Sequence, residues 1–318
     1  MEQLLGQGVS KATQRTYNSG RRQYCNFCQM LNCTPLPVQE VVLCRFVAFL
    51  FTSGLSYSSV RSYLSAVRHF QITSGLPDPS LSGFAQLDYV LKGYRRGGVS
   101  NPRQKRLPVT PTILRHIQAA WSASGASRDK VMLWAAFCLG FFGFMRAGEF
   151  TYPPNPQEAP EFLLVEDIAV DSHEAPQHMT VQLKRSKADP FGAGVTIHLG
   201  RTGEALCPVT AMLGYLARRP ATPGFLFLFE DGSPLTKPRL VHSFREALLA
   251  AGLDDKGFSG HSFRIGAATA AAEAGFSDSA IQMLGRWKSS AFLRYIRTPV
   301  QSLVRASSRL VQSGCHPH

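Results

Sequence analysis

The chain has 318 residues and a formal net charge of +13 at pH 7. It is longer than one typical domain and can bury a core in each of two. The positive charge favours a polyanionic partner, with nucleic acid as the first candidate. The longest apolar run, residues 131–145, is too short to cross a bilayer, since a spanning helix needs about 20 apolar residues. We therefore expect no membrane partner.

The cysteines indicate a reducing compartment and no metal site. There are seven, an odd number, and no secretory signal precedes the first helical pattern, so we expect an intracellular protein. Cys25 and Cys28 are spaced like zinc ligands, but they fall inside a helical pattern. No second Cys or His pair at structural zinc spacing follows. We expect ordinary thiols and no metal.

Residues 1–98 have the pattern of an all-helical domain. Polar caps and apolar residues at helical spacing predict four helices. The first follows Ser10 and runs to about residue 31, and the second covers residues 37–52. The third begins after Ser56 or Ser58, and the fourth covers residues 82–95.

This first part also carries most of the charge, because residues 1–106 hold 13 Lys and Arg against 4 Asp and Glu, a surplus of +9. A basic linker follows the helices at residues 99–109, where glycines and prolines mark a boundary. Basic residues that recur on outer helix faces or in the linker are candidate phosphate contacts, although each could simply solvate a surface. They are Lys11, Arg15, Arg22, Arg61, Arg68, Arg103, Lys105 and Arg106.

Residues 110–318 have the pattern of a mixed α+β domain. Their periodicity predicts a helix at 110–122, a buried helix from the start of the apolar run to Gly143, strands at 162–170, 179–183 and 195–199, and then helices only. These last helices start at residue 208, after Thr236, near His261, after Ser277, at Ser289 or Ser290, and at Thr298. The fold class we predict is therefore mainly α in two domains, with a small antiparallel sheet in the second.

Two pairs of residues three apart are suited to phosphate chemistry. Arg146 and Glu149 form one pair, and His261 and Arg264 form the other. Residues three apart on a helix share a face, and two guanidiniums can hold the oxygens of one phosphate. Tyr295 would be the nucleophile, with a pKa near 10 that needs neighbouring cations and a proton acceptor. No glycine-rich phosphate loop or acidic cluster is present, so we expect neither ATP nor any other cofactor.

This ordered set resembles the tyrosine recombinase (phage integrase) family, whose signature is Arg, Lys, His-x-x-Arg, His or Trp, and Tyr. The resemblance spans roughly residues 10–313. One departure is visible, because Trp287 precedes Tyr295 by eight residues where nine are expected. The segment Gly-Arg-Trp-Lys-Ser-Ser-Ala-Phe-Leu-Arg-Tyr-Ile-Arg looks most like recombinases of eukaryotic DIRS-like and Ngaro-like retrotransposons, which would make the shorter spacing a subgroup trait.

The resemblance implies a function and a role for each residue. The first domain would be the SAM-like core-binding domain, which clamps double-stranded DNA, and the second the catalytic domain. Tyr295 would form a 3′-phosphotyrosine, and Lys187 on the hairpin after the second strand would protonate the leaving oxygen, with Lys184 as its rival. The implied assembly is a tetramer on DNA, with the last helix docking on a neighbour.

The wider biological setting is also an expectation from the resemblance. It implies integration of a mobile element, in the nucleus. Two alternatives remain open at this point: a monomeric type IB topoisomerase with the same chemistry, and an inactive domesticated DNA-binding protein. The catalytic residues expected from the sequence are Arg146, Glu149, Lys187, His261, Arg264, Trp287 and Tyr295.

Overall fold

The computed structural model describes residues 8–97, 106–123, 125, 127–153, 162–172, 174–184, 189 and 192–297, and the side chains of all of these except 11 and 12. The chain divides into two compact units, Met1–Arg103 and Gln104–His318, which we call the N-terminal and C-terminal units. Each has its own hydrophobic core. The described residues are mainly helical with one small antiparallel sheet, so the predicted fold class is confirmed.

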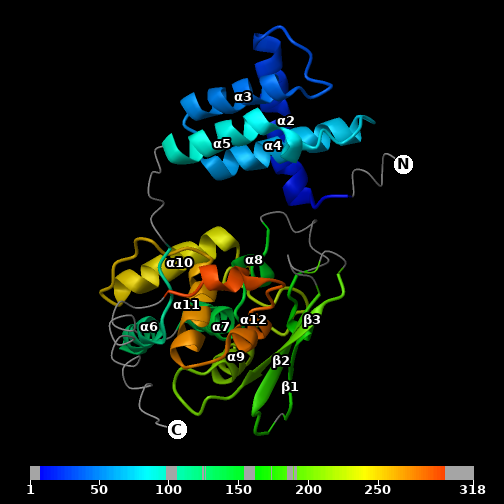
Figure 1. Ribbon diagram of the computed structural model, residues 1–318. Coiled ribbons are helices and arrows are strands. Elements are labelled where there is room, and N and C mark those ends of the chain that lie inside the picture. Colours follow the sequence, from blue (N-terminus) through cyan, green and yellow to red (C-terminus); the bar gives the residue numbers. More distant parts are fainter. Residues whose placement is uncertain are drawn as a thin grey trace, which may run out of the picture. The chain divides into compact units, whose positions relative to one another are not determined.

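The N-terminal unit is a bundle of helices (Figure 1). Ser10 and Ser56 act as the expected caps, because their hydroxyls accept hydrogen bonds from the amides of Thr13 and Ser59, both at 3.2 Å. The second helix begins later than predicted because the amide of Val38 instead donates to the Gln71 side chain at 2.6 Å. The helices are α2 (Lys11–Met30), α3 (Glu40–Thr52), α4 (Tyr57–Thr73) and α5 (Ala85–Gly97), with a 3₁₀ turn, η1 (Leu81–Gly83), before α5.

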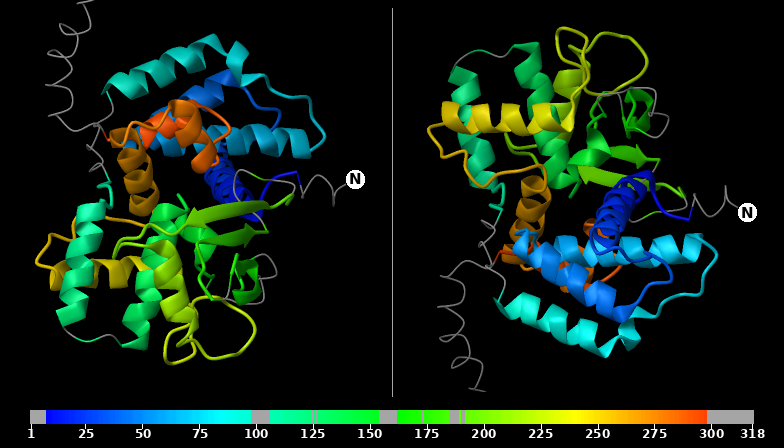
Figure 2. Two further views of the ribbon diagram at one scale, coloured as in Figure 1. Left: turned by 90° about the horizontal axis from the view of Figure 1, so that it is seen from below. Right: turned by 90° about the horizontal axis from the view of Figure 1, so that it is seen from above.

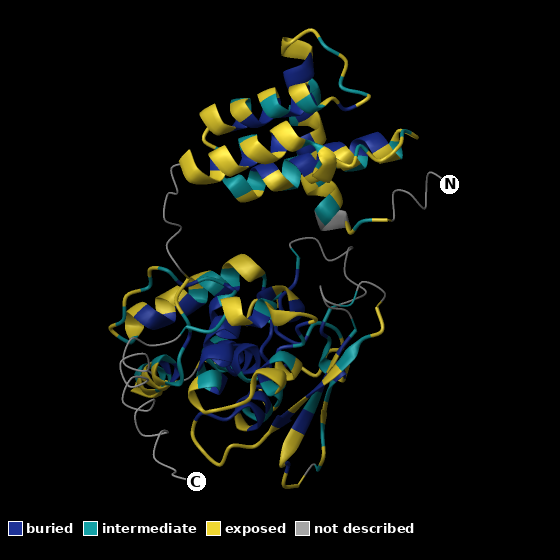
Figure 3. Cartoon of the chain, viewed as in Figure 1, coloured by how far each residue is buried: buried dark blue, intermediate teal, exposed yellow. Residues whose placement is uncertain are grey.

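Helices α2 and α4 pack closely where they meet at Gly20. A Cβ on Gly20 would lie 2.8 Å from Ala66 Cβ, so only glycine allows this approach. Beside the contact, Tyr24 and Phe27 pack against Phe46 of α3, with ring centroids 5.2 and 5.3 Å apart. The apolar faces are thereby turned inward, and the polar faces of the helices remain exposed (Figure 3).

The C-terminal unit combines helices with a three-stranded antiparallel sheet in the order β1-β2-β3. The strands lie at one edge of this unit (Figure 2). Val181 of the central strand pairs with Ile168 on one side and Ile197 on the other. The strands are β1 (Ile168–Val170), β2 (His178–Leu183) and β3 (Val195–Gly200). The helices are α6 (Pro111–Ala123), α7 (Arg128–Phe142), α8 (Ala147–Phe150), α9 (Pro208–Leu216), α10 (Lys237–Ala250), α11 (Ser262–Glu273) and α12 (Asp278–Leu284), with 3₁₀ turns η3 (Val165–Asp167) and η4 (Ser290–Arg294).

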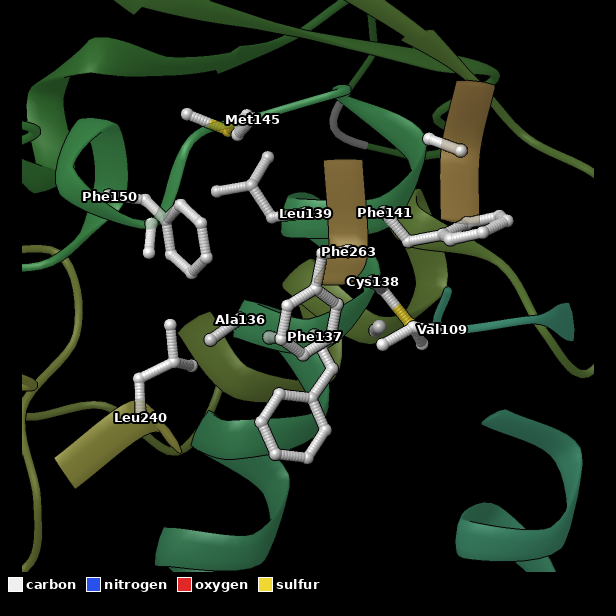
Figure 4. Close-up of a cluster of buried hydrophobic side chains, with 14 of the residues drawn as sticks. Val109, Ala136, Phe137, Cys138, Leu139, Phe141, Met145, Phe150, Leu240 and Phe263 are labelled. Atoms are coloured by element: carbon white, nitrogen blue, oxygen red, sulfur yellow. The ribbon is translucent and has the colours of Figure 1, made fainter. Parts of the chain in front are cut away.

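Helix α7 is the centre of this unit and is largely buried along its length (Figure 3). Its Phe137 stacks on Phe263 of α11, with ring centroids 5.4 Å apart, and meets Phe244 of α10 edge to face at 5.1 Å. Leu240 of α10 lies beside them (Figure 4). This contact fixes α11 against α7, and therefore places the His261–Arg264 segment beside the residues that follow α7.

Several predicted elements differ from the structure. The strand at 162–170 is wrong for its first six residues, because the Leu164 amide donates to the Asp167 carboxylate at 2.8 Å and makes a 3₁₀ turn. The core helix expected to end at Gly143 ends at Phe142, with Gly143 as its C-cap. Tyr295 directly follows the short 3₁₀ turn η4 and is not inside a helix. The helix predicted from Thr298 onward lies outside the described residues.

Candidate active site

Arg146 and Glu149 are held together as the sequence spacing predicted. A tight turn after α7 places Arg146 directly before α8, and Phe144 in this turn has left-handed backbone (φ 48). The Arg146 amide donates to Glu149 Oε2 at 2.9 Å, and Arg146 Nη1 donates to Oε1 at 2.7 Å. Glu149 is buried, whereas the Arg146 side chain keeps 20% exposure. Arg146 can therefore still reach a ligand.

Arg264 is the most deeply buried cation of the site, with no exposed surface. Its Nη1 and Nη2 donate to the backbone carbonyls of Phe144 and Gly285, whereas its Nε has no partner. Burial, followed by the charge of Arg146, lowers the pKa of Arg264 to about 9. The guanidinium is thus still charged at pH 7, and it ties together the turn after α7 and the end of α12.

Trp287 and Tyr295 lie against this guanidinium. Arg264 Cζ is 4.1 Å from the Trp287 ring centroid and 5.8 Å from that of Tyr295. The two rings are 5.2 Å apart. A desolvated guanidinium over an aromatic face is stabilised by about 2 kcal/mol. The indole ring of Trp287 can lie against the backbone of residue 285 because that residue is glycine. A Cβ added there would lie 1.5 Å from the indole ring.

His261 is the N-cap of α11 and is half-buried. Burial lowers its pKa to about 4, and the nearby charges of Arg106, Lys237, Arg146 and Arg264 act in the same direction. His261 is therefore neutral at pH 7 and can accept a proton. An anion bound among these cations would raise its pKa again.

Arg286 also belongs to this site, and sequence reasoning missed it. Its Nη2 donates to Glu149 Oε2 at 3.1 Å, so Glu149 lies between Arg146 and Arg286. The sequence contained a sign of this role. The family pattern places His or Trp nine residues before the tyrosine, and here Arg286 occupies that position, whereas Trp287 lies eight residues before Tyr295. The structure places Arg286 on Glu149, and Trp287 on Arg264.

The two candidate lysines have different surroundings. Lys187 lies outside the described residues. Lys184 Nζ lies 3.0 Å from Asp167 Oδ2, so Lys184 has an ion-pair partner within its own unit. On the same β2–β3 connection, hydrogen bonding from Gly194 lowers the pKa of Asp189, with a further contribution from the charge of Lys288. Asp189 therefore lies close enough to Lys288, the residue after Trp287, for their charges to interact.

The candidate DNA contacts divide into four groups. Arg15, Arg22 and Arg61 are exposed on α2 and α4. Arg68 is also exposed, but it forms a two-pronged ion pair with Asp78, in which Nε donates at 2.8 Å. A phosphate would have to compete with that carboxylate. Arg106 is exposed and close enough to His261 to affect its pKa. Outside the described parts lie the Lys11 side chain, Arg103 and Lys105.

Other classes of site find no support among the described residues. Within them, no three His, Cys, Asp or Glu side chains are grouped to hold a metal ion. Cys25 and Cys28 are free thiols, of which Cys28 is buried. No described helix is both long and apolar enough to span a membrane.

Comparison with known proteins finds similarity to integrases and recombinases. Residues 165–298 match the phage integrase family. A protein of Selenomonas ruminantium described as an integrase/recombinase xerD homolog is 24% identical over 303 residues, which cover 89% of this chain and 81% of that protein.

Two solved structures share the fold. The XerH site-specific recombinase bound to its palindromic difH substrate has a TM-score of 0.62 at 18% identity, covering 93% of this chain and 79% of that chain. A lambda integrase (75–356) dimer bound to a COC′ core site has a TM-score of 0.59 at 18% identity, covering 93% and 92%. The chain has the two-domain fold of these recombinases, and its similarity to the phage integrase family extends over residues 165–298.

Proposed function

We propose that this chain breaks and rejoins double-stranded DNA through Tyr295 and so performs site-specific strand exchange. The observation that carries the proposal is the position of the Arg264 guanidinium, which lies 5.8 Å from the Tyr295 ring and close enough to Arg146 and His261 for their charges to interact. A buried cation beside a phenol and a neutral imidazole suits a reaction in which a phosphodiester is attacked without a metal.

In the proposed reaction, the Tyr295 oxygen attacks the scissile phosphorus. A bond forms between this oxygen and phosphorus, and the bond from phosphorus to the 5′-oxygen breaks. The products are a 3′-phosphotyrosine and a free 5′-hydroxyl. His261 accepts the tyrosine proton, and Lys187 protonates the leaving oxygen. Attack by the 5′-hydroxyl of another strand reverses the step and completes the exchange.

Arg146 and Arg264 would bind the non-bridging oxygens and stabilise the charge that develops on them. Trp287 stacks on Arg264 and fixes its plane, and its indole N–H would donate to one of these oxygens. Glu149 holds Arg146 in place. Because Arg264 has no exposed surface, binding of the phosphate to it requires a local rearrangement of the residues that cover it.

The proposed setting is integration of a mobile element. The name integrase is carried by the matching family, by the Selenomonas ruminantium relative and by one of the structural neighbours, which supports this setting. The neighbours are described as complexes with DNA, and one of them as a dimer, which supports a DNA partner and self-association. We further propose a tetramer on DNA, and action in the nucleus for an enzyme of the DIRS-like kind.

Covalent attachment to DNA tests the proposal. Purified protein is incubated with supercoiled DNA and with a library of nicked duplexes, denatured, and analysed for protein-linked DNA. Wild type should give an adduct, also with a chelator present, because the arginines take the part of a metal. Tyr295→Phe should bind DNA equally and give none, since only the nucleophilic oxygen is lost. An adduct from Tyr295→Phe, or activity that chelation abolishes and magnesium restores, would contradict the mechanism.

A further inference from the structure

Arg286 has an unfavourable backbone conformation that its side chain explains. It follows the C-cap of α12, and its φ is 56, in the left-handed region. The Cβ of an L-residue is crowded there, so glycine or asparagine is usual at this position. Such conformations persist where the surrounding structure enforces them, and they concentrate at functional sites.

The Arg286 side chain connects three separate segments. Nη1 donates to the carbonyls of Gly143 at 2.9 Å and Leu284 at 3.2 Å. Nη2 donates to the Phe144 carbonyl at 3.3 Å and to Glu149 Oε2 at 3.1 Å. Only 12% of the side chain is exposed. The planar fork of arginine can make all four bonds, and lysine, a point donor, cannot.

These bonds converge on the turn that presents Arg146. The Phe144 carbonyl also accepts from Arg264 Nη1, so two guanidiniums hold the same turn. Glu149 uses Oε2 for Arg286 and for the Arg146 amide, and Oε1 for Arg146 Nη1. Arg286 therefore fixes both the backbone before Arg146 and the carboxylate that holds its side chain.

The net charge of these side chains also favours a contribution of Arg286 to the phosphate site. Arg146 and Arg264 with Glu149 alone would sum to +1, whereas adding Arg286 brings the buried group to +2. A phosphodiester carries one negative charge in the ground state and gains more as phosphorus becomes pentavalent. A site with one further positive charge stabilises that transition state more than the ground state.

We infer that Arg286 is a positioning residue for DNA cleavage, which acts through Glu149 and the 143–149 turn to hold Arg146 toward the scissile phosphate. The inference rests on the function proposed above. Arg286 then has a role distinct from that of its neighbour Trp287, and the end of α12 becomes part of the phosphate site.

The test compares Arg286→Lys and Arg286→Gly with wild type. Single-turnover formation of the covalent adduct is measured at saturating nicked duplex, and DNA affinity is measured separately. We expect both variants to cleave about 10²-fold more slowly, with affinity changed less than about threefold because the side chain is buried. Glycine relieves the left-handed backbone, so a purely conformational role would leave Arg286→Gly as fast as wild type.

Arg219→Lys is the matched control. Arg219 is likewise buried and donates to four backbone carbonyls, those of Pro220, Thr222, Phe225 and Leu226, and none of these belongs to the site. Its variant should lose thermal stability yet cleave at the wild-type rate when folded. Equal slowing of both variants would make Arg286 merely structural and overturn the inference.

A double variant separates positioning from independent action. If Arg286 acts through Arg146, then Arg146→Ala combined with Arg286→Lys should be no more than about threefold slower than Arg146→Ala alone. If the two rate losses multiply, the inference is wrong.

The linkage is also readable without cleavage. Arg286 and Glu149 share one contact, so each of the variants Arg286→Lys and Glu149→Gln already loses it. The double variant should therefore lower Tm by less than the sum of the two single variants, with a difference of about 3 °C or more. If wild type forms no adduct, the proposed function fails, and this cycle still decides the linkage. Additive shifts in Tm would contradict it.

Discussion

Gly285→Ala should strongly destabilise the C-terminal unit through Trp287. The added methyl would lie 1.5, 1.9 and 2.4 Å from three ring carbons, whereas carbon atoms in contact are normally about 3.5–4.0 Å apart. The indole must therefore move by about 2 Å, away from the Arg264 guanidinium that it now contacts at 4.1 Å. The backbone itself accepts alanine, since the φ of Gly285 is −82.

The magnitude follows from two terms. Forcing extra carbon into a packed core costs about 1–3 kcal/mol, and loss of a desolvated cation–π contact costs about 2 kcal/mol. Their sum is about 3–5 kcal/mol in free energy of unfolding, or roughly 10 °C in Tm for a unit of this size.

Thermal denaturation followed by circular dichroism, with indole fluorescence as a second probe, measures this change. Gly214→Ala is the control, because Gly214 lies within α9 and an added Cβ there meets nothing within 4 Å. The control should be neutral or slightly stabilising. If Gly285→Ala unfolds within 2 °C of wild type and its indole emission is unchanged, the packing argument for the Leu-Gly-Arg-Trp segment is refuted.

Three further predictions concern protonation, the leaving group and the N-terminal unit. The folded chain lowers the pKa of His261 to about 4, so between pH 6.5 and pH 4 the unfolded state binds more protons than the folded state. The free energy of unfolding should therefore fall by up to about 1.4 kcal/mol for each pH unit of acidification in this range. His261→Gln should flatten this dependence when Tm is measured as a function of pH. Lys187→Ala should cleave ordinary DNA slowly but recover on a substrate with sulfur in place of the bridging 5′-oxygen, which needs no proton; recovery by Lys184→Ala instead would move the role to that lysine. Removing residues 1–103 should reduce the slope of log DNA affinity against log salt concentration by several units, and Arg61→Ala should reduce it by about 0.9. Arg68→Ala should have a smaller effect, because Asp78 already neutralises Arg68. An unchanged slope after truncation would show that this unit is not the clamp.

The N-terminal unit shows how far local sequence signals reach. Ser10 and Ser56 cap their helices as predicted, since a cap bonds to an amide only three residues away. The start of α3 was predicted too early because its cause is distant, namely the bond from Val38 to Gln71, 33 residues along the chain. The ion pair of Arg68 with Asp78 could not be predicted either, because charge counts do not reveal which charges meet.

For the candidate site, the sequence by itself determined the kinds of residue and their local pairing. The spacing of Arg146 and Glu149 and the order of His261, Arg264 and Tyr295 were enough to predict phosphate chemistry, because a three-residue spacing brings side chains together within one turn. Only the tertiary structure decided which cations share Glu149. Arg286 reaches it across 137 residues, at a distance set by the packing of α11 on α7 and by the close approach of Trp287 to Gly285. Burial, which lowers the pKa of His261 and Arg264, likewise depends on every element packed around them and on no single stretch of sequence.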